Sequence, residues 1–281
     1  MSGSIGGKRI LREEVQGTVN KYIDKVLSGF PGFIKADITG SYNAGTRKDH
    51  GDIDLVVQLR GDDISKVKKE FKKYLDSLDN TLTPKFIFGR NCGNKSQLYG
   101  QIVTCGFPIV GRENDYVQVD NIIVISEEAG NFQKEFLNLD APKQALLMGY
   151  VRVCKNIYDK AKEFNIKLQP ILNNQEYEFV LSATGLSLRL VTLNDDYKEL
   201  CRKEIWRSYD WNKVRKLLTD INIYDSYDEI LKNISNNIFD QRSKRRIVGI
   251  MKSMINVGVG ELGTPKGDVK IRAIKLAEKI L

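Results

Sequence analysis

The sequence predicts an α+β protein, with a mixed β-sheet that carries helices on one side, followed by a mainly helical domain. Two observations predict this. Short apolar runs of strand length first alternate with helical segments and then follow one another up to residue 125. After residue 126, strand signals become rare and segments with helical spacing predominate. We therefore expect two domains, residues 1–126 and 127–281.

The first domain is expected to begin with a helix over residues 8–29, whose apolar positions recur at helical spacing and which Gly29 ends. A second helix over residues 64–78 presents an apolar face and a lysine-rich face. The expected strands are residues 33–39, 52–59, 82–88, 98–105 and 116–125.

The second domain is expected to begin with a strong helix over residues 141–164, with Pro142 near its first position. Residues 175–193 form another helix candidate, although their β-branched content leaves them ambiguous. The glycine-rich segment 257–270 is interpreted as a turn, with a phosphate-binding loop as the less favoured alternative. Further helices are expected within YKELCRKEIW, from Trp211, and over residues 228–239, 241–255 and 269–281.

Composition favours a cytoplasmic protein. The apolar runs are far shorter than the roughly 20 residues that a membrane span needs, and the N-terminus has no apolar signal region. The four cysteines form no CxxC pair and there is a single histidine, so we expect free thiols and no structural zinc. The net charge of +8 favours anionic partners, nucleic acid first, and we expect no membrane partner.

Asp52 and Asp54 open the apolar strand 52–59. Side chains two residues apart on a strand point to the same face, about 6.5 to 7 Å apart along it. Like charges at this distance repel, and a bound divalent cation would keep both carboxylates ionised. The pair therefore predicts a metal site.

Gly40 and Ser41 follow the strand 33–39 and are expected to open a helix, with Ser41 as its N-cap. Glycine lets the backbone approach an anion closely, and the N–H groups of a helix N-terminus favour phosphate. A phosphate site beside a metal-binding carboxylate pair is what metal-assisted transfer from a nucleoside triphosphate requires.

These elements together resemble the nucleotidyltransferase superfamily, the group of DNA polymerase beta, poly(A) and CCA-adding polymerases, oligoadenylate synthases and cyclic-dinucleotide synthases. The matching pattern is Gly40-Ser41, the ten-residue spacer from Tyr42 to Gly51, and then Asp52-Ile53-Asp54-Leu55. Gly45-Thr46 completes the GSYxxGT form of the RNA-directed branches. The alternative is a polar turn before an ordinary strand with surface aspartates. The resemblance implies the polymerase palm fold for residues 1–126.

The resemblance also implies a third carboxylate on a later, neighbouring strand, and Asp120 matches it by order and context. Asp120 lies among apolar residues of the expected strand 116–125, where a lone carboxylate is costly unless it is paired or metal-bound. Asp115 is the competing candidate, but it sits at a loop edge. Two weaker matches, a helix lysine and a serine on a following helix that lie near the triphosphate in the family, are Lys155 and Ser182.

The implied reaction is attack of a hydroxyl on the α-phosphate of a nucleoside triphosphate, with release of pyrophosphate. Asp52, Asp54 and Asp120 would hold two Mg²⁺ ions, with Mn²⁺ as the alternative, and Asp120 could also accept the proton. Gly40 and Ser41 would hold the terminal phosphates, and Arg47 or Lys48 could neutralise charge nearby. These residues make up the expected catalytic, metal and nucleotide-binding site.

Three functions remain open at this point. The first is an enzyme that adds nucleotides to an RNA or DNA 3′ end. The second uses the same chemistry as a synthase of short or cyclic oligonucleotides, or as a transferase to a small molecule or protein, with nucleic acid as an activator. The third is a non-catalytic nucleic-acid-binding protein, against which the complete set of three carboxylates argues.

Overall fold

The computed structural model describes residues 7–43, 48–78, 96–99, 102–139, 141–194, 199–218, 221–222, 225–238, 240–256, 274–275 and 277–279. The expected strand 82–88, the glycine-rich segment 257–270 and most of the expected helix 269–281 lie outside these residues. The chain divides into two compact units, Met1–Asn138 and Leu139–Leu281.

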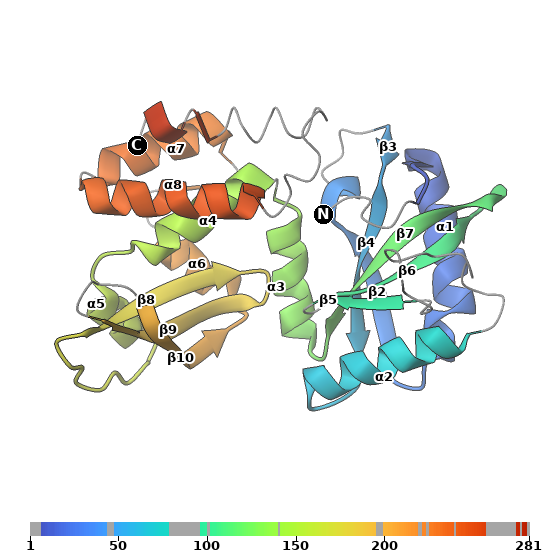
Figure 1. Ribbon diagram of the computed structural model, residues 1–281, viewed down its shortest axis with the longest axis horizontal. Helices are drawn as coiled ribbons and strands as arrows, with labels where there is room; N and C mark the ends of the chain where they lie inside the picture. Colours follow the sequence, from blue (N-terminus) through green and yellow to red (C-terminus); the bar gives the residue numbers. More distant parts are fainter. Residues whose placement is uncertain are drawn as a thin grey trace. The chain divides into compact units, whose positions relative to one another are not determined.

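The first unit is built on a five-stranded sheet in the order β2-β4-β7-β6-β5 (Figure 1). Strands β4 and β7 are parallel, and the other neighbours are antiparallel, so the sheet is mixed as the sequence predicts. The strands are β2 (Phe33–Thr39), β4 (Asp52–Leu59), β5 (Ser96–Tyr99), β6 (Ile102–Ile109) and β7 (Arg112–Val124).

Two helices, α1 (Arg12–Lys25) and α2 (Ile64–Ser77), lie against one face of this sheet. Their apolar residues join the alternate buried residues of β4, β6 and β7 in one core. Asp63 caps α2, because its carboxylate accepts hydrogen bonds from the backbone N–H groups of Ser65 and Lys66. A 3₁₀ helix (Leu27–Gly29) follows α1.

Helix α3 (Glu127–Leu137) contacts strands β4 and β7 and belongs to the first unit. It packs on the face opposite to α1 and α2, where Gly130 lies against Val56 and Val124. The domain boundary expected after residue 126 lies before α3, and the compact units divide after Asn138. The segment is largely polar in sequence, and this obscures the helix face formed by its buried residues Ala129, Phe132 and Phe136.

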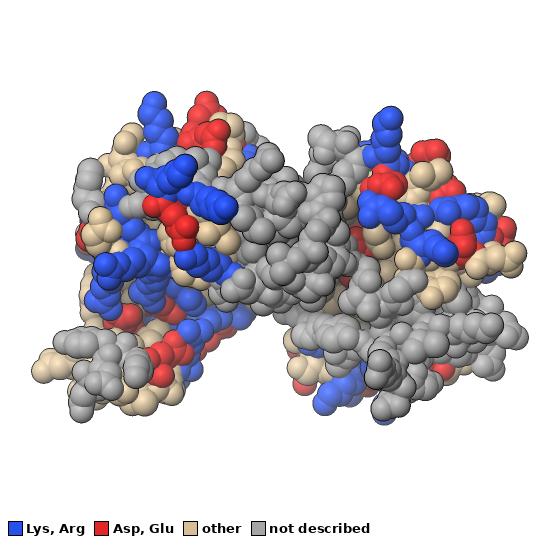
Figure 2. Space-filling model, turned by 45° about the horizontal axis from the view of Figure 1, so that its top comes forward, with Lys and Arg blue, Asp and Glu red and all other residues tan. Residues whose placement is uncertain are grey.

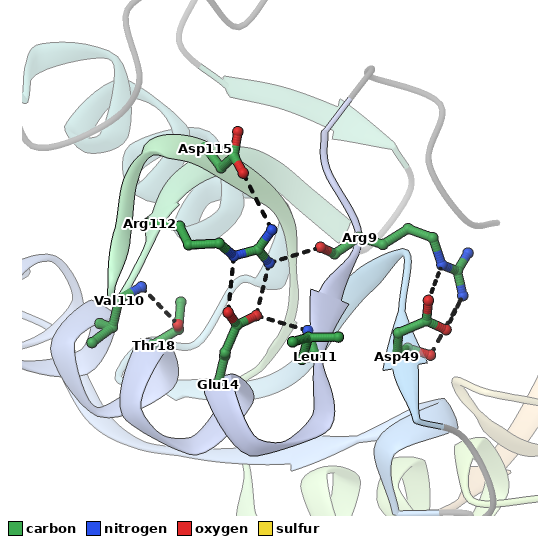
Figure 3. Close-up of polar contacts among 8 residues, drawn as sticks. All are labelled: Arg9, Leu11, Glu14, Thr18, Asp49, Val110, Arg112 and Asp115. Carbon is green, nitrogen blue, oxygen red and sulfur yellow. Dashed lines mark hydrogen bonds and ion pairs between the residues drawn. The ribbon is translucent and has the colours of Figure 1, made fainter.

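Strand β1 (Ile10–Leu11) pairs antiparallel with β3 (Asp49–His50). Strand β1 directly precedes α1, and β3 directly precedes β4. Figure 3 shows the contacts that hold the N-terminal segment in place. The guanidinium of Arg112 donates to both carboxylate oxygens of Glu14, at 2.8 and 2.7 Å, and to the backbone oxygen of Arg9. Glu14 also accepts the backbone N–H of Leu11, which closes the first turn of α1.

The second unit contains an antiparallel three-stranded sheet in the order β10-β9-β8, besides its helices. The expectation of a helix over residues 175–193 is therefore wrong, because this segment is the hairpin β8 (Gln175–Ser182) and β9 (Gly185–Leu193). The helix expected in YKELCRKEIW is also wrong, since it forms β10 (Glu199–Ser208), which pairs with β9. The β-branched and aromatic residues favour this pairing, and the domain is less helical than predicted.

The expected helix 141–164 is interrupted. Helix α4 (Ala141–Arg152) ends before Asn156, whose left-handed φ of 60° starts a new direction, and α5 (Ile157–Glu163) follows. The later helices confirm the sequence pattern; they are α6 (Trp211–Leu217), α7 (Tyr227–Asn237) and α8 (Gln241–Asn256). None of the helices in the described ranges has the length and apolar character to cross a bilayer.

Candidate active site

The three predicted carboxylates lie on one face of two neighbouring strands. Asp54 of β4 is the register partner of Asp120 of β7, and Asp52 lies two residues before Asp54 opposite Gln118. Paired residues of neighbouring strands, and residues two apart on one strand, share a face. The pairing register thus brings Asp120 beside the Asp52–Asp54 pair.

The apolar pattern of β4 explains why the carboxylates face away from the main core. Ile53, Leu55 and Val57 are buried among the residues that pack against α1 and α2. Alternation then sends Asp52 and Asp54 to the opposite face. A slip of one residue would bury both carboxylates in this core, so the apolar residues fix their direction.

Asp120 is the most enclosed of the three carboxylates, with 5% of its surface exposed. The hydroxyl of Thr104 donates to its Oδ1 at 2.7 Å, and Nε2 of Gln118 donates to both oxygens at 2.9 Å. Burial raises the pKa of Asp120 to about 6; the hydrogen bonds from Thr104 and Gln118 act in the opposite direction, and the negative charge of Asp52 raises it further. Burial is thus the main cause of the raised pKa of Asp120, and the charge of Asp52 adds to it.

The turn after β2 lies directly against this carboxylate group. Residues Gly40–Tyr42 form a 3₁₀ helix, in which Gly40 has a left-handed φ of 69°. A Cβ atom at Gly40 would lie 2.2 Å from Oδ2 of Asp54, so only glycine fits here. Ser41 lies inside the 3₁₀ helix and is not the N-cap that the sequence predicted, a position that Thr39 takes.

His50 is the residue that sequence reasoning missed. It is 1% exposed and lies in β3 as the partner of Ile10. Its Nδ1 is 3.1 Å from the hydroxyl oxygen of Ser41, and its ring centroid is 5.6 Å from that of Tyr42. The only histidine of the chain therefore contacts the candidate phosphate-binding turn.

Arg12 supports the same turn from the start of α1. Its Nη1 donates to the backbone oxygen of Tyr42 at 2.9 Å, and its guanidinium carbon lies 4.5 Å from the centre of the Tyr42 ring. Its backbone N–H donates to the oxygen of Lys48. The segment before α1 thus fixes both the turn and the residues that lead into β4.

The carboxylates fit Mg²⁺ by their chemistry, since Mg²⁺ prefers carboxylate oxygens together with phosphate and water. Among the residues that the structure describes, no three His, Cys, Asp or Glu side chains are gathered as a finished metal cluster. Asp120 accepts three hydrogen bonds out of the roughly four that a carboxylate can accept. Metal binding would therefore draw on the oxygens of Asp52 and Asp54 and on the remaining capacity of Asp120.

The other predicted nucleotide ligands lie outside the described residues or in the second unit. Arg47 lies outside the described residues, as do Gly45 and Thr46. Lys155 lies in the second unit between α4 and α5, and its positive charge contributes to the lowered pKa of Asp240. Ser182 lies at the end of β8 and not on a helix, and its hydroxyl contacts that of Thr184 at 2.9 Å within the hairpin turn.

Thr104 and Gln118 were also missed, although the sequence carries a signal for one of them. Gln118 is a polar residue two positions before Asp120 in an otherwise apolar strand, and strand alternation places both on one face. Thr104 has no such local signal, because its contact with Asp120 depends on the register between β6 and β7.

No protein-family model matches the chain, and no curated protein matches it by sequence. Among solved structures, the fold is similar to that of Leishmania infantum polymerase beta in a ternary gap complex, at 14% identity over 68% of this chain and 53% of that chain, with a TM-score of 0.40. The chain thus spans about half the length of that polymerase.

The fold is also similar to that of the Cid1 poly(U) polymerase with Mg and 3′-dATP bound, at 12% identity. This match covers 82% of this chain and 69% of that chain, with a TM-score of 0.31. Both similarities are at 14% identity or less, with TM-scores of 0.40 and 0.31.

Proposed function

We propose that the protein is a metal-dependent nucleotidyltransferase that moves a nucleoside monophosphate from a nucleoside triphosphate to a hydroxyl acceptor. One observation carries the proposal: the register of β4 and β7 pairs Asp54 with Asp120 and leaves Asp52 on the same face. The Gly40–Tyr42 turn touches this group, since Gly40 lies against the carboxylate of Asp54. A triphosphate held by the turn would thus lie beside the carboxylates.

In the proposed reaction, the acceptor hydroxyl releases its proton to the carboxylate of Asp120, its oxygen forms a bond with the α-phosphorus, the bond between this phosphorus and the bridging oxygen breaks, and pyrophosphate leaves. Asp52, Asp54 and Asp120 would hold Mg²⁺, which would supply charge stabilisation for the phosphates and lower the pKa of the attacking hydroxyl. The chain's own residues orient the substrate. The backbone and hydroxyl of Ser41 would bind the terminal phosphates, and Thr104 and Gln118 fix the direction of the Asp120 carboxylate.

We propose an RNA or DNA 3′ end as the acceptor, because the net charge of +8 favours a polyanionic partner. A synthase of short or cyclic oligonucleotides, or a transferase to a small molecule or protein, would use the same carboxylates. These alternatives differ in their product and are separated by the experiment below.

The test is incubation with each labelled nucleoside triphosphate and Mg²⁺, with and without oligo-RNA, tRNA or primed DNA, followed by sizing of the product. Extended strands are expected. A small cyclic product or labelled protein would show that the acceptor is a different one, and the proposed transfer reaction would stand. Asp54→Asn should abolish transfer, whereas Asp62→Asn removes the same charge from an exposed position after β4 and should leave it unchanged. Full transfer by the Asp54→Asn protein would refute the proposal.

A further inference from the structure

The net charge of the chain lies almost entirely in the second unit. Residues 1–138 contain 19 Lys and Arg against 18 Asp and Glu, a net charge of +1. Residues 139–281 contain 25 Lys and Arg against 18 Asp and Glu, a net charge of +7. Figure 2 shows Lys and Arg side chains gathered on the surface of the second unit. An anionic partner is therefore attracted mainly to this unit.

Arginines from four elements of this unit surround one buried carboxylate, that of Glu178 on β8. Arg152 of α4 and Arg246 of α8 both form ion pairs with its Oε2. Arg189 of β9 is its register partner. Arg202 of β10 is the register partner of Val191 on β9, and Val191 pairs in turn with Glu176 on β8, two residues before Glu178. We call Arg152, Arg189, Arg202 and Arg246 the arginine cluster.

Positive charge exceeds negative charge at the centre of the arginine cluster. Burial lowers the pKa of Arg152; the charge of Glu178 raises it, and Arg202, Arg246 and Arg189 lower it again. Two guanidinium groups thus pair directly with Glu178, and Arg189 and Arg202 add positive charge beside Arg152. Glu178 is itself almost fully buried, with 3% of its side chain exposed, so a partner cannot contact it.

The outer arginines are accessible to a partner. The side chains of Arg202 and Arg246 are 41% and 34% exposed. Their remaining acidic neighbours, Glu199 and Glu176, are 36% and 34% exposed, and ion pairs at this level of exposure contribute little and are screened by salt. Helix α8 adds exposed Arg242 and Arg245 within one turn of Arg246.

We propose that the arginine cluster, continued by the first turns of α8, binds the phosphate backbone of a nucleic acid strand. Guanidinium groups bind phosphate oxygens in pairs, and the cluster supplies them from a rigid sheet and two helices rather than from loops. The proposal deepens the proposed function and rests on it for the role of the strand, which would be the acceptor or an activator. Binding itself needs neither a nucleoside triphosphate nor a metal ion.

The test measures binding of fluorescent single-stranded RNA and DNA oligonucleotides by anisotropy, in EDTA and without nucleotide, over a series of salt concentrations. Arg202→Ala should weaken binding roughly fivefold at 0.1 M salt and reduce the slope of log K against log salt by about 1. Glu176→Gln should act in the opposite direction and tighten binding, because it removes the carboxylate 3.7 Å from Arg246. Comparison of the two oligonucleotides distinguishes RNA from DNA.

Arg60→Ala is the matched control, since it removes an exposed arginine from the first unit and should leave binding unchanged. Thermal melts confirm that each variant is folded. Wild-type affinity in the Arg202→Ala protein, equal losses in the Arg60→Ala protein, or no binding by the wild type would overturn the proposal. Because these measurements omit nucleotide and metal, a protein that binds strands without transferring nucleotides refutes only the proposed function, and transfer without binding at the cluster refutes only this inference.

Discussion

The Nδ1 atom of His50 lies 3.1 Å from the hydroxyl oxygen of Ser41, which joins strand β3 to the Gly40–Tyr42 turn. His50 is 1% exposed, so the side chains packed around it restrict rotation of its ring. The His50 ring therefore helps to orient the Ser41 hydroxyl, the group that the proposed function assigns to the terminal phosphates.

We expect His50→Leu to raise the KM for the nucleoside triphosphate several-fold with a smaller effect on kcat, because a contact made to the bound phosphates is lost in the ground state and the transition state alike. His50→Asn should restore much of the affinity, since its side chain can place a polar atom near the position of Nδ1. The measurement is steady-state kinetics with varied nucleotide.

Ser41→Ala provides the control for this contact. If His50 acts through Ser41, the KM of the Ser41→Ala/His50→Leu double variant should be no higher than that of the more impaired single variant. Additive losses would instead show that His50 acts separately from Ser41.

Gly40→Ala should damage both stability and transfer. The new Cβ would lie 2.2 Å from Oδ2 of Asp54 at a positive φ, so the Asp54 carboxylate has to move. Gly111→Ala is a matched control, because Gly111 has a φ of 84° but no atom within 4 Å of the new Cβ. Each change carries the left-handed backbone penalty of about 1 kcal/mol, measured by denaturant unfolding, and only Gly40→Ala should abolish transfer. Equal activity in both variants would contradict the role of the turn.

Asp120→Asn should stabilise the metal-free protein above about pH 6. The pKa of Asp120 is raised from 3.8 to about 6, so the folded state holds a proton that the unfolded state has released. Stability due to this group is therefore present below pH 4 and lost as the pH rises to 6, a change of roughly 3 kcal/mol at most. Thermal melts in EDTA at pH 4 and pH 7.5 test this, with a higher Tm for the variant expected only at pH 7.5.

Mg²⁺ should reverse the order. The wild-type protein should gain Tm on addition of Mg²⁺, because the ion relieves the repulsion between the carboxylates, and Asp120→Asn should gain less. A variant that melts at a lower temperature than the wild type in EDTA at pH 7.5 would identify Asp120 as a structural residue.

The Arg112–Glu14 ion pair should stabilise the N-terminal segment, as its contacts in Figure 3 indicate. A double-mutant cycle with Arg112→Ala and Glu14→Ala should give a favourable coupling energy, since the pair is bidentate and Glu14 is only 17% exposed. The Arg9–Asp49 pair has similar geometry but is 57% and 41% exposed, so its cycle should give a coupling near zero. Equal couplings would show that burial does not decide the strength of these pairs.

The sequence by itself determined the features that depend on neighbours along the chain. Strand alternation placed Asp52 and Asp54 on one face, and the structure shows β4 with this pattern. The same local reasoning located β2, α2 and α8, because amphipathic spacing and turn residues act within one element. The superfamily resemblance also depended on one continuous stretch, from Gly40 to Leu55.

Only the tertiary structure decided the pairings between distant segments. The register that sets Asp120 beside Asp54, the hydroxyl of Thr104 on Asp120, and the contact of His50 with Ser41 all join elements whose alignment no local pattern specifies. The segment 175–193 shows the reason most plainly: its apolar, β-branched residues suit a helix or a strand, and the pairing of β8 with β9 and of β9 with β10 selected the sheet. That sheet brings Arg189 and Arg202 near the arginines of α4 and α8, so these positive charges form a cluster only on folding.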